Sequence, residues 1–213
     1  MGLLSTILKY VEYALGKLLI SRRGYDDGLF SRTPAFRKCP EPTIQLSSLD
    51  CGPSYSRLSH DYSMFGKGLM PTLTWPEANE NIREYLVIIE DVDAPFGGKP
   101  NVHGIYALIP PSTTSLSPHD LETVDTDVKG QHRLKSGFRV GKNRRNVVYI
   151  PCRPPLGHGP HRYFCELVAL SEKLDPDTLS PVPTKEELAE LVKGKVVAWG
   201  EWVGVYESDW NER

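Results

Sequence analysis

The sequence predicts a mainly-β domain, a β-sandwich with peripheral helices. Short apolar runs recur along the chain, proline and glycine residues separate them, and helical periodicity occurs at two places. Many short strands with few helices are typical of a sandwich. A chain of 213 residues is also long enough to bury one substantial core. We therefore expect a single domain that carries an N-terminal extension.

The composition argues against several classes of protein. The net charge is −2 and no basic run is longer than Arg144-Arg145, which argues against binding to nucleic acid. The four cysteines form no C-x-x-C pair, so a zinc knuckle is not expected. No cleavable signal sequence is evident in the first residues. We therefore expect buried free thiols and a reducing, cytoplasmic location.

Residues 1–25 predict an amphipathic helix. Apolar residues occupy positions 3, 4, 7, 8, 11, 14, 15, 18 and 19, which form one stripe on a helix. The charges within the segment argue against a transmembrane span. Two interpretations remain open. The stripe docks on the domain, a partner protein or a second copy of the chain, or the helix lies in a membrane interface. Met1-Gly2 with Thr6 fits the loose pattern for myristoylation, which would support membrane contact.

Residues 26–59 are assigned to a connector, because residues 26–45 are rich in proline, arginine and glycine and predict an extended chain. Beyond residue 60 the pattern favours strands. The run "EYLVIIED" (84–91) is apolar until its final acids, which is typical of a central strand covered on both faces. The other strands are expected at residues 70–75, 103–110, 146–151 and 162–170.

A second helix is expected at residues 184–193, near the C-terminus. Thr184 is a suitable N-cap, Glu187 supplies the carboxylate of a capping box, and Gly194 would end the helix. The segment "KVVAWGEWVGVYE" (195–207) then predicts a last strand with two bulky tryptophans.

Two acids and a histidine mark the ends of neighbouring strands. Asp91 and Asp93 close the strand at 84–91, and the two-residue period of a strand places them on one face. Acids at such a position are typical of the rim of a site, but an Asp beside Ala-Pro equally caps a turn. His103 opens the next strand, where a histidine is often only a polar edge residue.

The segment "YIPCRPPLGHGPHRYF" (149–164) combines a proline- and glycine-rich loop with titratable side chains. Such a loop turns backbone N–H groups outward together, which makes a nest for an anion. His161 and Tyr163 share one face if residues 161–164 are extended. Arg162 then points the other way, where an ion pair with a loop carboxylate is its ordinary role.

These fragments resemble the signatures of the phosphatidylethanolamine-binding protein family. "DVDAP" (91–95) followed by His103 is similar to the first signature, and "PPLGHGPHRY" (154–163) is similar to the second. "GKN" (141–143) and "GEWVGVY" (200–206) also look like family features, and the resemblance covers roughly residues 60–207. It implies an antiparallel β-sandwich over residues 60–207, with a small pocket for phosphate, carboxylate and similar anions, and without cofactor or metal. The pocket residues that carry over are Asp91, Asp93, His103, Pro155, His161 and Tyr163.

The sequence departs from the family pattern in ways that affect the pocket. Val92 replaces the proline of the first signature, and the aromatic residues usual around the histidine are replaced by Val102 and Gly104. Loss of the proline predicts a less rigid turn. Loss of the aromatic residues predicts that the pocket wall is opened or reshaped, which would admit a ligand larger than a phospholipid headgroup.

The resemblance implies two kinds of function. Fungal relatives with a long N-terminal extension occur in secondary-metabolite pathways, where they are implicated in joining alkyl-maleic anhydride units into maleidrides. In that case His103 or His161 would hold a carboxylate or move a proton, with Asp91 orienting the histidine. The alternative is a non-enzymatic regulator that binds phospholipid headgroups or phosphorylated partners, or a protease or kinase inhibitor, with the N-terminal helix as contact arm.

Two enzyme classes fit the sequence poorly. A metal hydrolase could draw ligands from the same acids and histidines together with His158, but no two histidines have the spacing of a ligand pair on one helix. A serine hydrolase would need a G-x-S-x-G elbow, which the chain lacks.

Overall fold

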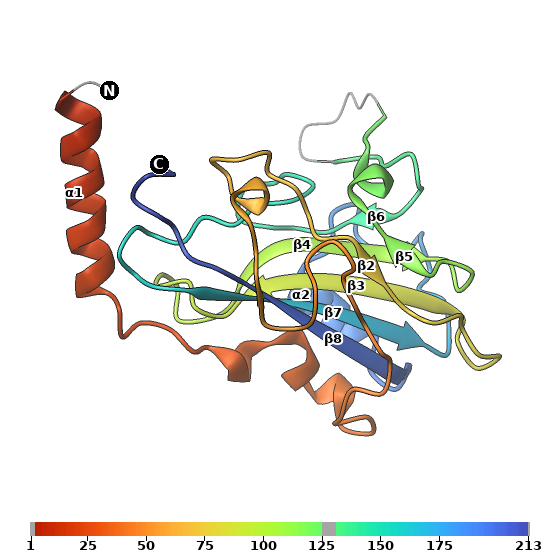
Figure 1. Ribbon diagram of the computed structural model, residues 1–213. Coiled ribbons are helices and arrows are strands. Elements are labelled where there is room, and N and C mark those ends of the chain that lie inside the picture. Colours follow the sequence, from red (N-terminus) through yellow and green to blue (C-terminus); the bar gives the residue numbers. More distant parts are fainter. Residues whose placement is uncertain (1–2, 125–130, 213) are drawn as a thin grey trace.

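The computed structural model describes residues 3–124 and 131–212, and its centre is a six-stranded sheet (Figure 1). All neighbouring strands are antiparallel except β1 and β8, which are parallel, and a second sheet of two strands packs nearby. The mainly-β fold class is therefore confirmed. The main sheet has the order β1 (Ser56–Arg57), β8 (Val196–Tyr206), β7 (His161–Leu170), β3 (Glu84–Asp91), β4 (Asn101–Ile109), β6 (Arg139–Val140), and the small sheet pairs β2 (Leu73–Thr74) with β5 (Ser115–Leu116).

The four long strands lie where the apolar runs predict them, and two other expected strands do not. Residues 70–75 contribute only the two residues of β2. Residues 146–151 form no strand, so that prediction was wrong. Asn146 has a positive φ of 52°, and the amide of Asn143 bonds both the N–H and the carbonyl of Val147. These contacts satisfy the backbone locally, where a strand would need a neighbour.

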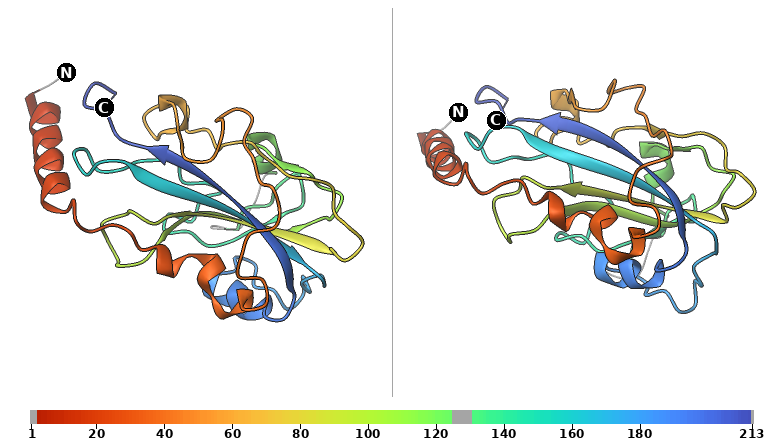
Figure 2. Two further views of the ribbon diagram at one scale, coloured as in Figure 1. Left: turned by 60° about the horizontal axis from the view of Figure 1, so that its bottom comes forward. Right: turned by 90° about the horizontal axis from the view of Figure 1, so that it is seen from below.

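The main sheet is covered on both faces. Every residue of β3 is buried, as the continuous apolar run predicts. Tyr85 and Val87 face a cluster that includes Trp202 and the small sheet. Leu86 faces the opposite cluster, where Trp199 and helix α2 (Lys185–Leu191) pack (Figure 2). The sheet thus forms the rigid middle layer on which the polar strand ends are mounted.

Helix α2 begins as its capping signal predicts. The hydroxyl of Thr184 accepts a hydrogen bond from the backbone N–H of Glu187 over 3.1 Å. The carboxylate of Glu187 accepts instead from the backbone N–H of Ser180, so the reciprocal bond of a capping box is replaced by a tie to the preceding loop. Gly194, with a φ of 78°, follows the helix in the left-handed conformation that favours glycine.

The connector is folded against the sheet, which corrects the expected extended chain. It forms three short 3-10 turns, Asp26–Gly28, Phe30–Arg32 and Pro34–Phe36. The backbone N–H of Phe30 donates to Glu90 over 2.9 Å, and that of Ser31 donates to Glu166 over 3.3 Å. Both acids are fully buried, so they satisfy the turn's donors inside the protein.

Helix α1 (Leu3–Leu18) stands at one end of the molecule, beside the C-terminus (Figure 1). Its Tyr13 and Gly16 contact the loop at residues 156–158, whereas the apolar stripe does not dock on the domain. The helices of the described residues include none that is long and apolar enough to cross a membrane. The exposed stripe consists of Leu4, Ile7, Leu8, Val11, Leu15 and Leu18, each at least 49% exposed.

Candidate functional site

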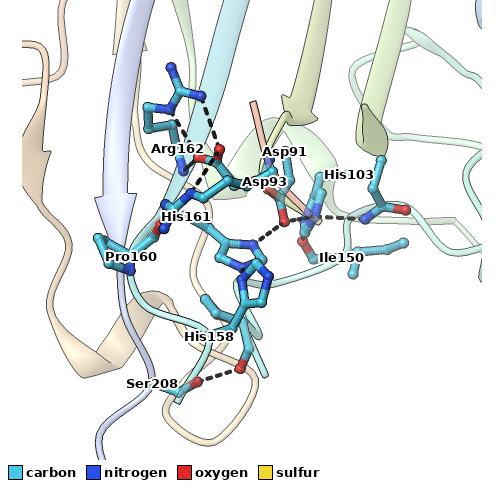
Figure 3. Close-up of polar contacts among 12 residues, drawn as sticks. Asp91, Asp93, His103, Ile150, His158, Pro160, His161, Arg162 and Ser208 are labelled. Carbon is cyan, nitrogen blue, oxygen red and sulfur yellow. Dashed lines mark hydrogen bonds and ion pairs between the residues drawn. The ribbon is translucent and has the colours of Figure 1, made fainter. Parts of the chain in front are cut away.

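Three polar residues from three neighbouring strands meet at one end of the main sheet (Figure 3). Asp91 ends β3, His103 lies near the start of β4, and His161 begins β7. Oδ2 of Asp91 lies 2.9 Å from Nδ1 of His161 and 3.9 Å from Nε2 of His103. All three residues are buried. Antiparallel pairing of β3 with both β4 and β7 therefore brings together residues that are far apart in the chain.

His103 is held as a neutral ring. Its Nδ1 lies 2.6 Å from the carbonyl oxygen of Ile150, which can only accept, so Nδ1 carries the proton. Its Nε2 lies 2.9 Å from Nδ2 of Asn101 and accepts from that amide. Burial lowers the pKa of His103 from its ordinary value, although the nearby charge of Asp91 acts in the opposite direction. The ring therefore keeps the lone pair on Nε2.

A chain of hydrogen bonds links His161 to the end of α1. Nε2 of His158 donates to the carbonyl oxygen of Leu19 over 2.9 Å, and Nδ1 of His158 lies 2.8 Å from Nε2 of His161. Burial, and then the neighbouring His161, lower the pKa of His158, so its neutral Nδ1 accepts from His161. One nitrogen of His161 is thus engaged by His158 and the other by Asp91. His161 therefore has no nitrogen that acts as an acceptor, whereas His103 has one, Nε2, which is bonded to the amide of Asn101.

A cavity of about 90 Å³ opens beside these residues. A water molecule takes up about 30 Å³ of liquid, so the cavity suits a group of a few heavy atoms such as a carboxylate. Within residues 3–124 and 131–212, no three His, Cys, Asp or Glu side chains gather closely enough to hold a metal ion. Of the positions predicted from the sequence, the cavity is lined by Asp91, His103, Pro155 and His161, and it is not lined by Asp93 or Tyr163.

Two arginines that the sequence analysis did not single out also line the cavity. Arg144 follows the "GKN" segment, and Arg153 immediately precedes the second motif. The guanidinium of Arg153 lies 5.4 Å from the ring centroid of Phe65. Burial, and then the positive charge of Arg145, lower the pKa of Arg144 from its ordinary value. The only signal for either residue in the sequence is a basic side chain next to a motif.

Helix α1 contributes a carboxylate to the same cavity. Glu12 lines it, and its Oε1 accepts a hydrogen bond from the backbone N–H of Leu156 over 3.2 Å. The proline- and glycine-rich loop was expected to bind an anion through its backbone N–H groups. One of these groups already donates to a carboxylate of the chain itself. Asp91 is bonded to His161, and the other charged groups that line the cavity are two guanidinium groups and the carboxylate of Glu12. The electrostatics favour an anionic ligand.

Asp93 lies outside the cavity and ties the connector to the sheet. Its carboxylate accepts from the backbone N–H and the guanidinium of Arg162 and from the backbone N–H of Gly24. Burial opposes ionisation of Asp93, but the hydrogen bonds from Arg162 outweigh burial and keep the pKa below its ordinary value. Arg162 also pairs with Asp26, and Arg23 lies 3.6 Å from Asp93. The ion pair expected for Arg162 is therefore present.

Tyr163 shares a face of β7 with His161 but lies deeper in the core. Its ring packs edge-on against His103, with 5.1 Å between the centroids. Its buried hydroxyl has no hydrogen-bond partner among the nitrogen and oxygen atoms of the described residues, and it lies close to the thiol of Cys152. Burial raises its pKa well above the ordinary value. In this position Tyr163 supports the ring of His103 from behind.

Comparison with known proteins identifies the family of the chain. Residues 51–207 match the family model of the phosphatidylethanolamine-binding protein. The chain belongs to the phosphatidylethanolamine-binding protein family. A crystal structure of a family homologue from Chlamydia trachomatis superposes with a TM-score of 0.64 at 24% identity, covering 79% of this chain and all of that chain. A family member from Escherichia coli gives 0.62 at 23% identity, covering 78% of this chain and 99% of that chain. At these identities the two structures support the fold alone.

Two curated relatives of this family member match almost the whole chain. A protein named phomoidride biosynthesis cluster protein B, from a fungal species, is 55% identical over 99% of this chain and 100% of its own length. A protein of the same name from Talaromyces stipitatus is 53% identical over 96% of this chain and 84% of its own length. The similarity therefore extends beyond the family domain into the N-terminal extension.

The departures from the family pattern have different structural consequences. Val92 is fully buried in a small apolar cluster with Leu29 and Phe164, so it packs the connector onto the sheet. A Cβ atom added to Gly104 would lie 2.6 Å from the hydroxyl oxygen of Tyr106. The ring of Tyr106 therefore fills the space next to Gly104, and the wider opening expected there is absent.

Proposed function

We propose that this family member binds a carboxylate-bearing intermediate of the maleic anhydride type and assists the joining or cyclisation of such units in fungal secondary-metabolite biosynthesis. The relatives named for a phomoidride biosynthesis cluster support the pathway context. The observation that carries the proposal is the positively charged cavity, in which Arg144 and Arg153 lie beside His103. Guanidinium groups bind carboxylates through paired hydrogen bonds.

The protonation pattern supports His103 as the group that accepts a proton. Its Nε2 is an acceptor, which here takes a hydrogen bond from the amide of Asn101, whereas both nitrogens of His161 act as donors. In the proposed step, Nε2 of His103 takes a proton from the alkyl CH2 group attached to the carbon–carbon double bond of the maleic unit. The bonding electron pair is delocalised through that double bond onto the carbonyl oxygen as a dienolate, and Arg144 and Arg153 stabilise its negative charge. His103 becomes an imidazolium, which returns the proton later.

Reconstitution of product formation with the biosynthetic enzymes of the same cluster tests this function. We expect His103→Ala to reduce product formation by about 100-fold or more, the typical contribution of a general base. His161→Ala should weaken binding of a small dicarboxylate, measured by calorimetry. The matched control is Lys135→Gln, since Lys135 is exposed and pairs with Glu122 far from the cavity. Product formation undiminished in His103→Ala would overturn the chemical role.

A second role, as a protein-binding module, is favoured by the exposed apolar stripe on α1. In this role the chain would recruit a biosynthetic enzyme through the stripe, and the cavity would only hold the ligand. Leu8→Glu tests it, because Leu8 is 60% exposed within the stripe. The control is Leu49→Glu, which changes an apolar side chain that is 87% exposed on the body. Equal co-purification of both variants with the enzymes of the cluster would exclude this role.

A further inference from the structure

A second, larger hollow adjoins the cavity. Its volume is about 500 Å³, compared with about 90 Å³ for the cavity. Asn101 at the start of β4 and Arg144 line both hollows. The two spaces are therefore neighbours that share a wall of one amide and one guanidinium, and the amide of Asn101 is the group bonded to His103.

The second hollow, called the basic groove below, is lined by four cationic side chains and one carboxylate: Lys99, Lys142, Arg144, Lys185 and Glu186. Lys185 is already used, because its amine bonds Glu90 and the carbonyl of Gly28. Lys99 lies 3.6 Å from Glu186, and both side chains are about 70% exposed. An ion pair this exposed contributes little to stability.

Two cations of the basic groove form no ion pair with a carboxylate of the described residues. The ion pairs of residues 3–124 and 131–212 include neither Lys142 nor Arg144. Lys142 is held in place through its backbone, which donates to the carbonyl of Pro183, so its side chain is free to turn toward a ligand. Positive charge also crowds Arg144, since Arg145 and Arg153 both act to lower its pKa. A bound anion would relieve this repulsion.

We propose that the cavity and the basic groove form one bipartite site for two carboxylate-bearing units, with Arg144 contacting both. One unit lies in the cavity against His161 and Arg153, and the second lies in the groove against Lys142. This inference rests on the proposed function and deepens it, since joining two units requires both to be held at once. Placing the two side by side converts an encounter in solution into a reaction within one complex.

Calorimetry with 2,3-dimethylmaleate, the dianion formed when dimethylmaleic anhydride is hydrolysed, tests the stoichiometry. We expect two equivalents to bind per chain. Lys142→Gln should remove one and leave the other. Lys193→Gln is the matched control, because Lys193 is a partly exposed lysine just beyond α2 that pairs with Glu190 outside the groove. One equivalent in the native chain, or equal behaviour of the two lysine variants, would overturn the bipartite site.

A linked probe provides an independent measurement. Butane-1,2,3,4-tetracarboxylate contains two succinate halves joined by a carbon–carbon bond, as a coupled product would. We expect it to bind about 100-fold more tightly than dimethylmaleate, because linking makes the second contact intramolecular. Lys142→Gln should abolish that gain. No gain from linking would contradict the proposal.

The two hypotheses fail in different ways. If the bipartite site is wrong but the proposed function holds, one equivalent of dimethylmaleate binds and Arg153→Gln weakens it. If the proposed function itself is wrong, dimethylmaleate binds no more tightly than inorganic phosphate at the same ionic strength, and Arg153→Gln changes neither. Phosphate that occupies the groove as tightly as dimethylmaleate would overturn the assignment of the groove to carboxylates.

Discussion

Arg162 and Asp93 form a bidentate ion pair, in which Nε and Nη2 of the arginine each lie 2.9 Å from a different carboxylate oxygen. The backbone N–H of Arg162 adds a third hydrogen bond to the same carboxylate. Asp93 is fully buried, and its side chain also holds the N–H of Gly24. The pair thus fastens the segment that leads from α1 to the first turn of the connector.

We expect Arg162→Met to lower the free energy of unfolding by about 3 kcal/mol, because the buried carboxylate of Asp93 loses its bidentate partner and keeps only Arg23 at 3.6 Å. Chemical denaturation measures the change. The matched control is Lys135→Met, which removes the cation of the exposed pair with Glu122 and should cost about 1 kcal/mol or less. Equal losses in the two variants would show that the buried pair is no stronger than a surface pair.

Gly157 is expected to control how α1 rests on the motif loop. Its φ is 80°, and an added Cβ would lie 2.7 Å from the ring of Tyr13. Gly157→Ala should therefore displace α1 and change the fluorescence of Trp210. The ring centroids of Trp210 and Tyr13 lie 6.0 Å apart. Gly98→Ala carries the same backbone strain of about 1 kcal/mol but meets no atom within 4 Å. The fluorescence of Trp210 should stay unchanged in that control.

Acid should release the contact between His158 and His161. The pKa of His158 is lowered in the folded protein, so the contact is present above the ordinary value of about 6.5 and is lost as pH falls through the lowered value. Protonation places a second N–H on the ring, which then opposes the N–H of His161 and adds repulsion with Arg23.

The change is measured as a step in the fluorescence of Trp210 on titration from pH 8 to pH 5. The step should be absent in the Trp210→Phe variant. His158→Gln should remove the step, since an amide does not titrate in this range. A step that persists in His158→Gln would assign it to another group.

Glu166 should make the protein less stable at alkaline pH. Burial raises its pKa to about 8, and the nearby charge of Glu90 acts in the same direction. The folded state therefore binds a proton more tightly than the unfolded state, whose carboxyl has a pKa near 4.5. The stabilisation is complete below about pH 4.5 and is lost as pH rises through about 8.

Glu166→Gln should flatten this dependence, measured as the free energy of unfolding between pH 5 and pH 8.5. A smaller slope of the same sign should remain, because burial also raises the pKa of Glu84 to about 7. An unchanged slope in Glu166→Gln would show that Glu166 is ionised at neutral pH in the folded protein.

Local sequence pattern predicted the strands that carry the site. The apolar runs placed β3, β4, β7 and β8, and the motifs placed Asp91, His103 and His161 at the ends of three of them. The two-residue period of a strand did not place Asp93 correctly. Strand β3 ends at Asp91, and the chain turns before it reaches Asp93. Period also placed Tyr163 correctly on the face of His161 without revealing that it lies one layer deeper.

The sequence by itself therefore determined the fold class and the three polar strand ends, since periodicity and turn residues act over a few neighbouring positions. The tertiary structure alone decided which charged groups share the cavity. Glu12 comes from α1, and Arg144 and Arg153 come from loops that no periodic pattern describes. Their positions depend on contacts between segments more than 50 residues apart in the chain, such as the hydrogen bond from Leu156 to Glu12. Long-range packing fixes such contacts, and local sequence does not encode them.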